Sequence, residues 1–211
     1  MSARSKAYWD ANAGAFAFSH ALEPTWLAEI PKDARIVDYG CGYGRTLTEL
    51  ARGGWRNTLG VDFSGEMIAR GRAEHPDLVL RHIEATRSAE PDGAFEAAIL
   101  FAVLTSIPDD AEQLAVMAEL RRLLRLGGLL YLSDYGLQAG PRYAERYRLG
   151  LERHGMLGVW DREDGGVFRH HTPERLAELM AGFDVVAERK VDSVTMSGAP
   201  AVVTQLLGRR R

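Results

Sequence analysis

Short apolar runs alternate with helix-like patterns between residues 35 and 133, and this alternation constrains the fold more than any other feature of the chain. Between the runs, apolar residues recur every three or four positions, as on one face of a helix. Strand–helix alternation with short connections predicts a parallel sheet with helices on both faces, a doubly wound α/β fold. The expected strands cover residues 35–39, 58–62, 78–83, 95–103 and 129–133.

The C-terminal part of the chain follows a different pattern. A helix at residues 173–180 precedes two candidate strands, 183–189 and 201–207. The link between these strands is too short for a crossover helix, so we expect an antiparallel pair. No linker rich in proline, glycine or serine divides the 211 residues, and we therefore expect one domain over residues 1–211.

Two glycines follow the longest helix-like pattern. Asp109 and Glu112 have the spacing of a capping box and mark the start of this helix. Gly127 and Gly128 follow its last apolar positions, and glycine commonly ends a helix. We therefore expect the helix to stop at the double glycine.

Charge and composition exclude several classes of partner. The chain has 26 Lys+Arg and 29 Asp+Glu, a net charge of −3, whereas proteins that bind nucleic acid usually present a basic face. We expect the basic groups at residues 121–125 and 209–211 to be solvated. The longest run without an acidic or basic residue, 193–208, contains Gly198 and Pro200 and is short of the ~20 apolar residues of a membrane span. No nucleic-acid or membrane partner is therefore expected.

The cysteine content indicates a compartment. Cys41 is the single cysteine of the chain, which forbids an intrachain disulfide and a thiolate-based zinc cluster. A reducing cytoplasm fits this composition. The oligomeric state is left open by the sequence.

A glycine-rich segment, DYGCGYG at residues 38–44, closes the first expected strand and opens a helix. Glycine lets a backbone turn tightly and lets a ligand approach it closely. The helix N-terminus behind it suits a carboxylate or a phosphate. Asp62 ends the next strand, and in a doubly wound sheet such a carboxylate lies beside the loop and accepts ribose hydroxyls. The pair predicts a ligand that contains a nucleoside.

The spacing of the glycines distinguishes between two classes of nucleoside-containing ligand. Dinucleotide binding expects G-x-G-x-x-G, which would place the third glycine at position 45, but that residue is Arg45 and the glycine is Gly44. A pyrophosphate would also lie poorly beside the carboxylate of Asp38. A ligand with an ammonium and a sulfonium group would be attracted by it, so the loop favours S-adenosylmethionine over a nicotinamide dinucleotide.

On four segments the chain resembles the class I S-adenosylmethionine-dependent methyltransferases. They are residues 36–50 (IVDYGCGYGRTLTEL), 60–68 (GVDFSGEMI), 95–104 and 123–132 (LLRLGGLLYL), in the order of the family. The resemblance implies a Rossmann-like, seven-stranded, mostly parallel sheet with an antiparallel C-terminal pair. It also implies an enzyme that uses S-adenosylmethionine and releases S-adenosylhomocysteine. Leu126 departs from the family, where proline commonly precedes the double glycine, and we expect only a local change of turn.

The resemblance further implies the residues that bind the cofactor. The glycines would wrap its methionine portion, Asp38 would meet its ammonium group, and Asp62 would accept its ribose hydroxyls. Phe63 and Met67 would pack on the adenine, with ordinary core packing as the alternative, and a solvated loop position is the alternative for Glu84. The expected cofactor-binding residues are Asp38, Gly40, Cys41, Gly42, Gly44, Asp62, Phe63, Met67, Glu84, Ala85, Phe101 and Ala102.

Recognition of the acceptor is expected outside the core, in an N-terminal helical cover at residues 1–30 and an insertion at residues 134–171. Aromatic side chains with several arginines suit a small anionic acceptor, because a guanidinium pairs bidentately with carboxylate-like oxygens. A solvated helix face is the alternative for each arginine. The expected acceptor-binding residues are Tyr8, Trp9, His20, Tyr135, Arg142, Arg146, Trp160, Arg169 and His170.

The sequence does not single out one catalytic group, and His170, His171 and Tyr135 are the candidates. Histidine titrates near neutral pH and can serve as a general base. Adjacent histidines in a strand point to opposite faces, so we expect no metal site.

The leading hypothesis is methyl transfer from S-adenosylmethionine to a small molecule by in-line displacement. The acceptor atom would be an oxygen or nitrogen nucleophile, and anionic acceptors are included. The alternative is a non-catalytic S-adenosylmethionine-binding sensor or partner protein. A nicotinamide oxidoreductase is the third hypothesis, which Arg45 and the antiparallel C-terminal pair disfavour.

Overall fold

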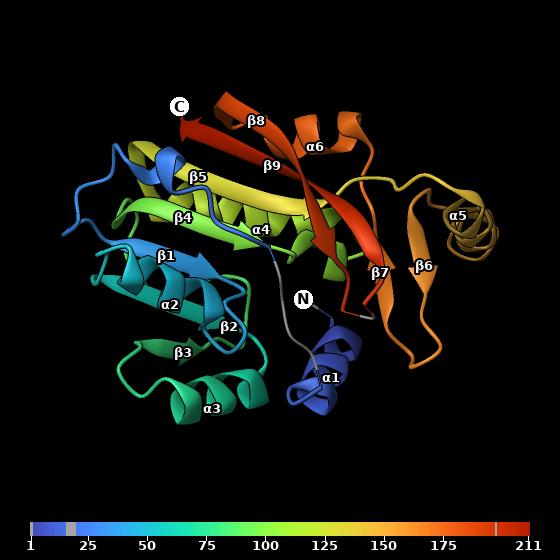
Figure 1. The fold of residues 1–211 in the computed structure, drawn as a ribbon, viewed down its shortest axis with the longest axis horizontal. Helices are drawn as coiled ribbons and strands as arrows, with labels where there is room; N and C mark the ends of the chain where they lie inside the picture. Colours follow the sequence, from blue (N-terminus) through green and yellow to red (C-terminus); the bar gives the residue numbers. More distant parts are fainter. Residues whose placement is uncertain (1, 16–19, 197) are drawn as a thin grey trace.

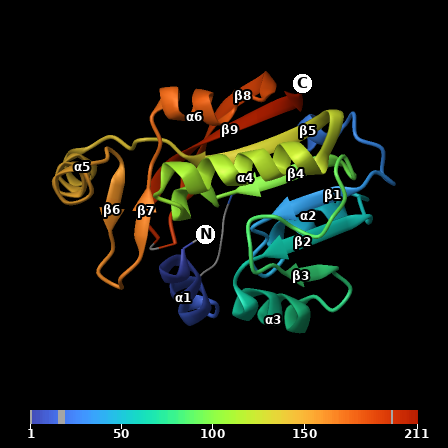
Figure 2. The same ribbon diagram turned by 180° about the vertical axis from the view of Figure 1, so that it is seen from behind.

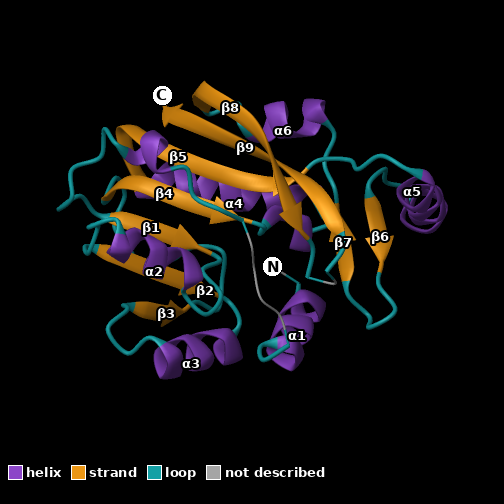
Figure 3. Ribbon diagram, in the orientation of Figure 1, coloured by secondary structure: helices purple, strands orange, loops and turns teal. Residues whose placement is uncertain are grey.

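A computed structural model describes residues 2–15, 20–196 and 198–211. The helices are α1 (Ala3–Asn12), α2 (Arg45–Arg52), α3 (Gly65–Glu74), α4 (Asp110–Leu123), α5 (Pro141–His154) and α6 (Pro173–Leu179), with 3-10 turns η1 (Pro24–Leu27) and η2 (Leu104–Ser106) (Figure 3). The strands are β1 (Ile36–Tyr39), β2 (Thr58–Asp62), β3 (Leu80–His82), β4 (Phe95–Phe101), β5 (Leu124–Tyr135), β6 (Val159–Asp161), β7 (Val167–Arg169), β8 (Phe183–Val194) and β9 (Pro200–Arg210). None of the described helices has the length and apolar character needed to cross a membrane.

Seven of these strands form one sheet in the order β3-β2-β1-β4-β5-β9-β8 (Figure 1). β1 pairs in parallel with β2 and β4, and β3 and β5 continue this direction on either side. β9 is antiparallel to both β5 and β8. The predicted doubly wound, mostly parallel sheet with an antiparallel C-terminal pair is confirmed.

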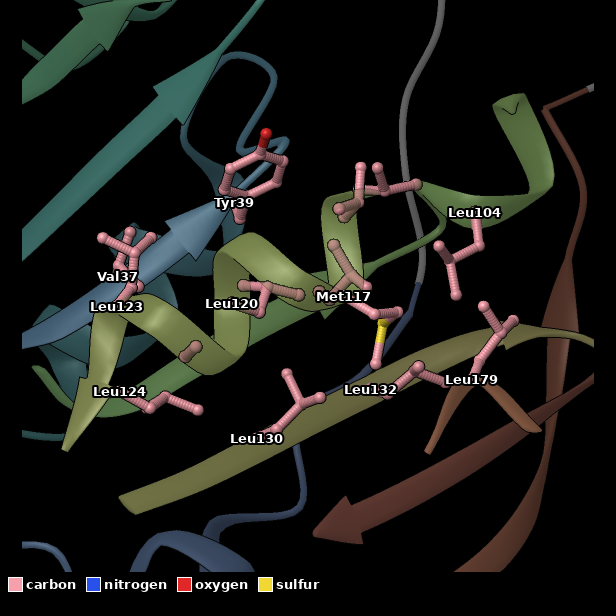
Figure 4. Close-up of a cluster of buried hydrophobic side chains, with 14 of the residues drawn as sticks. Val37, Tyr39, Leu104, Met117, Leu120, Leu123, Leu124, Leu130, Leu132 and Leu179 are labelled. Atoms are coloured by element: carbon pink, nitrogen blue, oxygen red, sulfur yellow. The ribbon is translucent and has the colours of Figure 1, made fainter. Parts of the chain in front are cut away.

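Two clusters of buried apolar side chains hold the helices to the two faces of the sheet. On one face, Leu120 of α4 and Leu179 of α6 pack with Leu132 of β5 (Figures 2 and 4). On the other face, Leu47 of α2 and Ile68 of α3 belong to the second cluster. Burial of one such side chain stabilises the fold by roughly 1.5–3 kcal/mol. The apolar residues that the helical spacing places on one face therefore hold each helix against the sheet.

The carboxyl ends of the parallel strands meet at one edge of the sheet, and the remaining elements stand beyond that edge (Figure 1). α1, α5 and the small β6–β7 sheet lie there, and the turn between β8 and β9 reaches the same region. Ligands of open α/β sheets bind at this edge, because the strand-to-helix loops converge on it.

The two segments expected to recognise the acceptor both reach this edge. Residues 134–171 contribute α5, β6 and β7, and the expected cover at residues 1–30 contains α1 and η1. Residues 1 and 16–19 of that cover lie outside the described residues. α1 is joined to α3, since the Ser64 hydroxyl donates to Asp10 at 2.7 Å and the Arg70 guanidinium donates to the Ala13 carbonyl at 2.8 Å.

The predicted end of α4 is wrong. The helix ends at Leu123, and Leu124 already pairs with Phe95 of β4. Gly127 then adopts a φ of +72° inside β5, close to the point where the β4–β5 register shifts. The double glycine therefore accommodates an irregularity near the start of a strand. In the sequence alone, it looks the same as the glycines that end a helix.

The prediction that both basic groups are solvated is also wrong in part. Arg122 is only 12% exposed and donates to Glu119 at 2.7 Å and to Asp92 at 2.6 Å. Arg209 and Arg210 belong to β9, and Arg209 pairs with Glu29 at 3.1 Å. Both groups thus contribute to the packing of the domain, which local charge patterning does not reveal.

The pair between Glu119 and Arg122 predicts a large effect on stability. Replacing Glu119 with alanine leaves the largely buried guanidinium with only the 75%-exposed Asp92 as an ionic partner, so the free energy of unfolding should fall by about 3 kcal/mol. Glu152→Ala is the matched control, because Glu152 pairs with Arg148 on the exposed face of α5 and its loss should cost less than about 1 kcal/mol. Urea unfolding of both variants measures the difference, and equal losses would contradict the prediction.

Candidate functional site

The glycine loop, residues 40–44, connects β1 to α2 at the carboxyl edge of the sheet. Gly40 has a φ of +77°, and a Cβ built on it would lie 2.4 Å from Cγ2 of Val103. Only glycine fits a left-handed position with so little space around it. The loop therefore turns tightly enough to bring main-chain N–H groups beside the first turn of α2, an arrangement suited to anionic groups.

Asp62 ties the glycine loop to the end of β2. One carboxylate oxygen accepts from the Gly42 N–H at 2.8 Å, and the other accepts from the Ser64 N–H at 2.8 Å. The side chain is buried, and burial raises the pKa of Asp62 to about 6, against the lowering effect of the two N–H groups. Each carboxylate oxygen can accept a further hydrogen bond, so Asp62 remains able to bind a hydroxyl donor.

Asp38 carries a buried oxygen without a partner. The residue is 2% exposed, and its Oδ2 has no hydrogen-bond partner among the described residues. Burial raises the pKa of Asp38 to about 7, and the guanidinium of Arg45 acts in the opposite direction. Because buried polar atoms are nearly always satisfied, an unpaired carboxylate oxygen in a cavity wall indicates a site for a donor or a cation.

A cavity of about 680 Å³, which we call the glycine-loop cavity, collects most of the residues expected to bind the cofactor. Its walls come from the loop, the ends of β1, β2 and β4, and α1, α2 and α3. The expected residues in its lining are Asp38, Gly40, Cys41, Gly42, Asp62, Phe63, Met67, Phe101 and Ala102. The other lining residues are Trp9, His20, Arg45, Thr46, Val103 and Ser106.

Three of the residues expected to bind the cofactor lie outside this lining. Gly44 precedes α2, and a Cβ on it would lie 2.8 Å from Cδ1 of Leu78, so it serves core packing. Glu84 and Ala85 line a separate recess, which touches the glycine-loop cavity only through the shared side chain of Phe63. Both follow the edge strand β3, where the chain turns away from the sheet.

A second cavity of about 660 Å³, which we call the adjoining cavity, opens beside the first. It lies between α1, α5, the β6–β7 sheet and the turn between β8 and β9. Of the residues expected to bind the acceptor, Trp9, His20, Tyr135, Arg142, Arg146, Trp160 and His170 line it. The remaining lining residues are Ala102, Thr105, Ser106, Tyr143, Arg162, Phe168, Val194, Thr195, Met196 and Ala199.

The adjoining cavity is positively charged. Three arginines line it, and no aspartate or glutamate is among its described lining residues. The guanidinium of Arg146 lies 3.8 Å from the ring centre of Trp160, and burial followed by repulsion from Arg142 lowers the pKa of Arg146. Arg162 is paired with Asp164 at 2.7 Å, whereas no described carboxylate lies within ion-pair distance of Arg142 or Arg146. Two guanidinium groups in this arrangement can form charge-assisted hydrogen bonds with an anionic group.

Four residues line both cavities: Trp9, His20, Ala102 and Ser106. Ala102 has a φ of +56°, and among the described residues no other non-glycine has a positive φ. Its N–H donates to the Ser133 carbonyl at 2.8 Å, which holds the strained residue at the end of β4. Strained backbone of this kind is concentrated at functional sites, where the surrounding structure maintains it.

His20 lies at this junction with one nitrogen satisfied. Its Nδ1 is 3.0 Å from the Ser133 hydroxyl, its ring contacts Tyr135 edge-on, and its Nε2 has no hydrogen-bond partner among the described residues. Burial, and then the charge of Arg45, lowers the pKa of His20 to about 4. The imidazole is therefore neutral at physiological pH.

Two of the three residues expected to be catalytic line the adjoining cavity and contact each other. His170 stacks on Tyr135 with ring centres 5.3 Å apart, and the Nδ1 of His170 is 2.6 Å from the Tyr147 hydroxyl. Burial lowers the pKa of His170 to about 3 and raises the pKa of Tyr135 above its ordinary range. Both side chains are thus neutral walls of the cavity at physiological pH.

His171, Tyr8 and Arg169 line neither cavity. His171 is buried with Nε2 2.8 Å from the Gln113 amide nitrogen and Nδ1 3.2 Å from the Tyr135 carbonyl. Arg169 pairs with Asp110 at 2.6 Å. The Tyr8 hydroxyl donates to Asp164, on the turn between β6 and β7, at 3.1 Å. His170 and His171 point to different partners, and among the described residues no group of three His, Cys, Asp or Glu side chains could hold a metal ion.

Sequence reasoning missed several lining residues. The missed residues include Val194, at the end of β8, and Thr195, Met196 and Ala199, between β8 and β9, where the sequence presented only a short link. These strands are longer than expected and carry their turn to the ligand edge of the sheet. Arg45 was weighed only as a departure from the dinucleotide motif, although its place in the first turn of α2 was a usable signal. Tyr143 could have been found from its helical spacing with Arg146 and Tyr147 on α5.

Comparison with known proteins gives a consistent result. A family model described as a methyltransferase domain matches residues 15–188. The ubiquinone biosynthesis O-methyltransferase of Xanthomonas axonopodis pv. citri is 31% identical in an alignment of length 137 that covers 60% of this chain and 55% of that protein. The chain spans about half the length of the curated relatives it matches.

Solved structures share the fold. A SAM-dependent methyltransferase from Methanosarcina mazei superposes with a TM-score of 0.83 and 23% identity over 90% of this chain and 99% of that chain. A 1,6-didemethyltoxoflavin-N1-methyltransferase from Burkholderia thailandensis, solved with 1,6-didemethyltoxoflavin and S-adenosylhomocysteine, superposes with a TM-score of 0.64 and 18% identity over 99% and 78% of the two chains. At these identities the likeness concerns the fold.

The packing of the glycine loop predicts its sensitivity to a single methyl group. Gly40→Ala should lower the free energy of unfolding by about 2 kcal/mol or more. The alanine would have to adopt a left-handed conformation, and its Cβ would clash with Val103 unless the backbone shifted. Gly65→Ala is the control, since a Cβ there meets nothing within 4 Å in the first turn of α3, and it should be neutral or stabilising by up to about 1 kcal/mol. Urea unfolding compares the two, and a tolerated Gly40→Ala would show that the loop is looser than the structure indicates.

Proposed function

The chain belongs to the methyltransferase-domain family whose model matches residues 15–188, and from this premise we propose that it methylates a small aromatic acceptor that carries an anionic group. Its cofactor is S-adenosylmethionine, and the protein is an enzyme of methyl transfer. The positive charge of the adjoining cavity is the observation that carries the choice of acceptor.

S-Adenosylmethionine supplies a methyl group on a positively charged sulfur, which a nucleophile displaces in line. We assign this molecule to the glycine-loop cavity, because the residues there match its polar groups. The unpaired Oδ2 of Asp38 is a buried partner for the ammonium group, and Asp62 retains acceptor capacity for ribose hydroxyls. The first turn of α2 suits the carboxylate, and Phe63 and Met67 supply apolar surface for the adenine.

The acceptor is assigned to the adjoining cavity. The rings of Trp160, Phe168 and Tyr135 form its apolar walls, which suit a flat aromatic molecule. Arg142 and Arg146 give it two cations without a carboxylate partner among the described residues, which suits a carboxylate or a similar anion on that molecule. Aromatic and arginine side chains from several elements line this cavity together, which suits a small molecule.

Similar proteins support small acceptors. The Xanthomonas relative is named for O-methylation in ubiquinone biosynthesis, and the Burkholderia structure holds 1,6-didemethyltoxoflavin as its acceptor. Membership of the family favours an enzyme over the non-catalytic binding protein and the nicotinamide oxidoreductase considered from the sequence.

The two buried carboxylates predict how cofactor affinity depends on pH. Burial raises the pKa of Asp62 to about 6 and of Asp38 to about 7, and hydroxyl and ammonium donors bind the ionised forms. The affinity for S-adenosylhomocysteine should therefore rise between pH 5.5 and 7.5 by about tenfold or more, since ligand binding must displace protons at low pH. Titration calorimetry across this range measures the change, and a flat profile would contradict the assignment.

Asp62→Asn tests the same site at one pH. The variant should bind S-adenosylhomocysteine about 10- to 100-fold more weakly at pH 7.5, because it loses charge-assisted hydrogen bonds of roughly 1.5–3 kcal/mol. Asp77→Asn changes an exposed acid outside both cavities and should leave affinity unchanged. Equal affinities of the two variants would remove Asp62 from the cofactor site.

Arg146→Gln tests the acceptor class. We expect kcat/KM to fall about 10- to 100-fold for hydroxylated aromatic carboxylic acids, through loss of a charge-assisted contact, and to stay unchanged for their neutral methyl esters. Affinity for S-adenosylhomocysteine should not change. Arg148→Gln, on the exposed face of the same helix, is the matched control. A wild-type enzyme that prefers the esters would overturn the proposal of an anionic acceptor.

A further inference from the structure

One of the four residues shared by the two cavities carries a basic ring nitrogen. Trp9, Ala102 and Ser106 offer no such group, whereas His20 offers an imidazole. The side chain is 3% exposed, and its Nε2 has no hydrogen-bond partner among the described residues. A buried ring nitrogen left unsatisfied between the cofactor and acceptor cavities needs a partner that a bound molecule can supply.

The other nitrogen of His20 lies beside a hydroxyl group. Nδ1 is 3.0 Å from the Ser133 hydroxyl, whose oxygen can accept a hydrogen bond from a protonated Nδ1. The Gln205 amide donates to the Ser133 hydroxyl at 3.2 Å and to the Ala21 carbonyl at 2.8 Å, next to His20 in the chain. With the proton on Nδ1, the lone pair is on Nε2 and directed away from the β5 backbone.

We propose that His20 is the general base of the reaction and that its Nε2 takes the proton from the O–H or N–H group of the acceptor. This inference rests on the proposed methyl transfer. The acceptor–hydrogen bond breaks and a bond from Nε2 to that proton forms, while the electron pair left on the acceptor atom bonds to the methyl carbon and the carbon–sulfur pair stays on sulfur. The proton leaves His20 to water after the product is released.

The surroundings of His20 suit this role. The charged or titratable groups that face it are Arg45, whose guanidinium donates to the His20 carbonyl at 2.7 Å, Asp38 across the glycine-loop cavity, and Tyr135 against its ring. Burial and Arg45 keep the imidazole neutral, so the lone pair is available before transfer. His20 stays neutral beside Arg45 and the positive sulfur, and its affinity for a proton rises once that sulfur has lost its charge in the transfer.

The residues named as catalytic from the sequence fit this role less well. His170 lines the adjoining cavity alone, and its Nδ1 is engaged by the Tyr147 hydroxyl at 2.6 Å. Burial raises the pKa of Tyr135, so the phenol is a poor base at neutral pH. His171 lines neither cavity, and both of its nitrogens lie within hydrogen-bond distance of protein groups.

Kinetics of His20→Asn provide the first test. With hydroxylated aromatic acids of graded hydroxyl pKa, we expect kcat to fall about 10²- to 10⁴-fold for acceptors that are protonated at the assay pH. For acceptors that are already ionised, the kcat of His20→Asn should approach that of the wild type. Affinity for S-adenosylhomocysteine should change less than about threefold, and His75→Gln, outside both cavities, should match the wild type. A loss that is equal for all acceptors indicates a merely structural role and overturns the proposal.

Nitrogen NMR of the histidine rings provides a test that needs no acceptor. In the complex with S-adenosylhomocysteine, the neutral His20 ring should carry its proton on Nδ1. A neutral ring with its proton on Nε2 would overturn the proposal, because that nitrogen could not accept a proton from the acceptor. If the wild type binds S-adenosylhomocysteine but methylates no aromatic acid, the proposed acceptor class fails, and the NMR result still decides the state of His20.

Discussion

The hydrogen bonds that Asp62 accepts from Gly42 and Ser64 are the contacts on which the ligand edge depends. They join the end of β2 to the glycine loop and to the start of α3, at distances of 2.8 Å each. α1 is then fixed to α3 through Ser64 and Asp10, so the wall opposite the loop depends on the same carboxylate. A single buried acid thereby connects the sheet, the loop and the N-terminal helix, although burial opposes its ionisation.

The two cavities differ in charge in a way that suits their proposed ligands. Buried carboxylates, Asp38 and Asp62, lie in the wall of the glycine-loop cavity, and arginines line the adjoining cavity. The ammonium group of the cofactor and an anionic acceptor would each meet the opposite charge, with the neutral ring of His20 between the two cavities. The net charge of −3 says nothing of this separation, because it averages over the whole surface.

The parts of the fold that follow from local pattern were predicted well. The apolar spacing on α2 and α4, and the alternation of strands and helices along the chain, depend on neighbours within a few residues and on burial, which sequence periodicity reports. Gly127 was misjudged because its role depends on a strand far along the chain. Arg122 was misjudged because, besides nearby Glu119, it contacts Asp92 and the carbonyls of Ser88 and Glu90, about thirty residues away. A double glycine at a β-irregularity and one at a helix end look alike until the pairing of β4 with β5 is known.

The sequence by itself determined the sheet, the glycine loop and Asp62, since strand–helix alternation places these residues at one edge wherever the chain folds in this way. It also named His20, Arg142 and Arg146 as residues for an acceptor. Only the tertiary structure decided that His20 stands at the junction of the two cavities while His171 is turned into a buried network. That distinction depends on the packing of residues 20 and 21 against β5 and β9, which brings residues more than a hundred positions apart into contact, and no local pattern encodes such contacts.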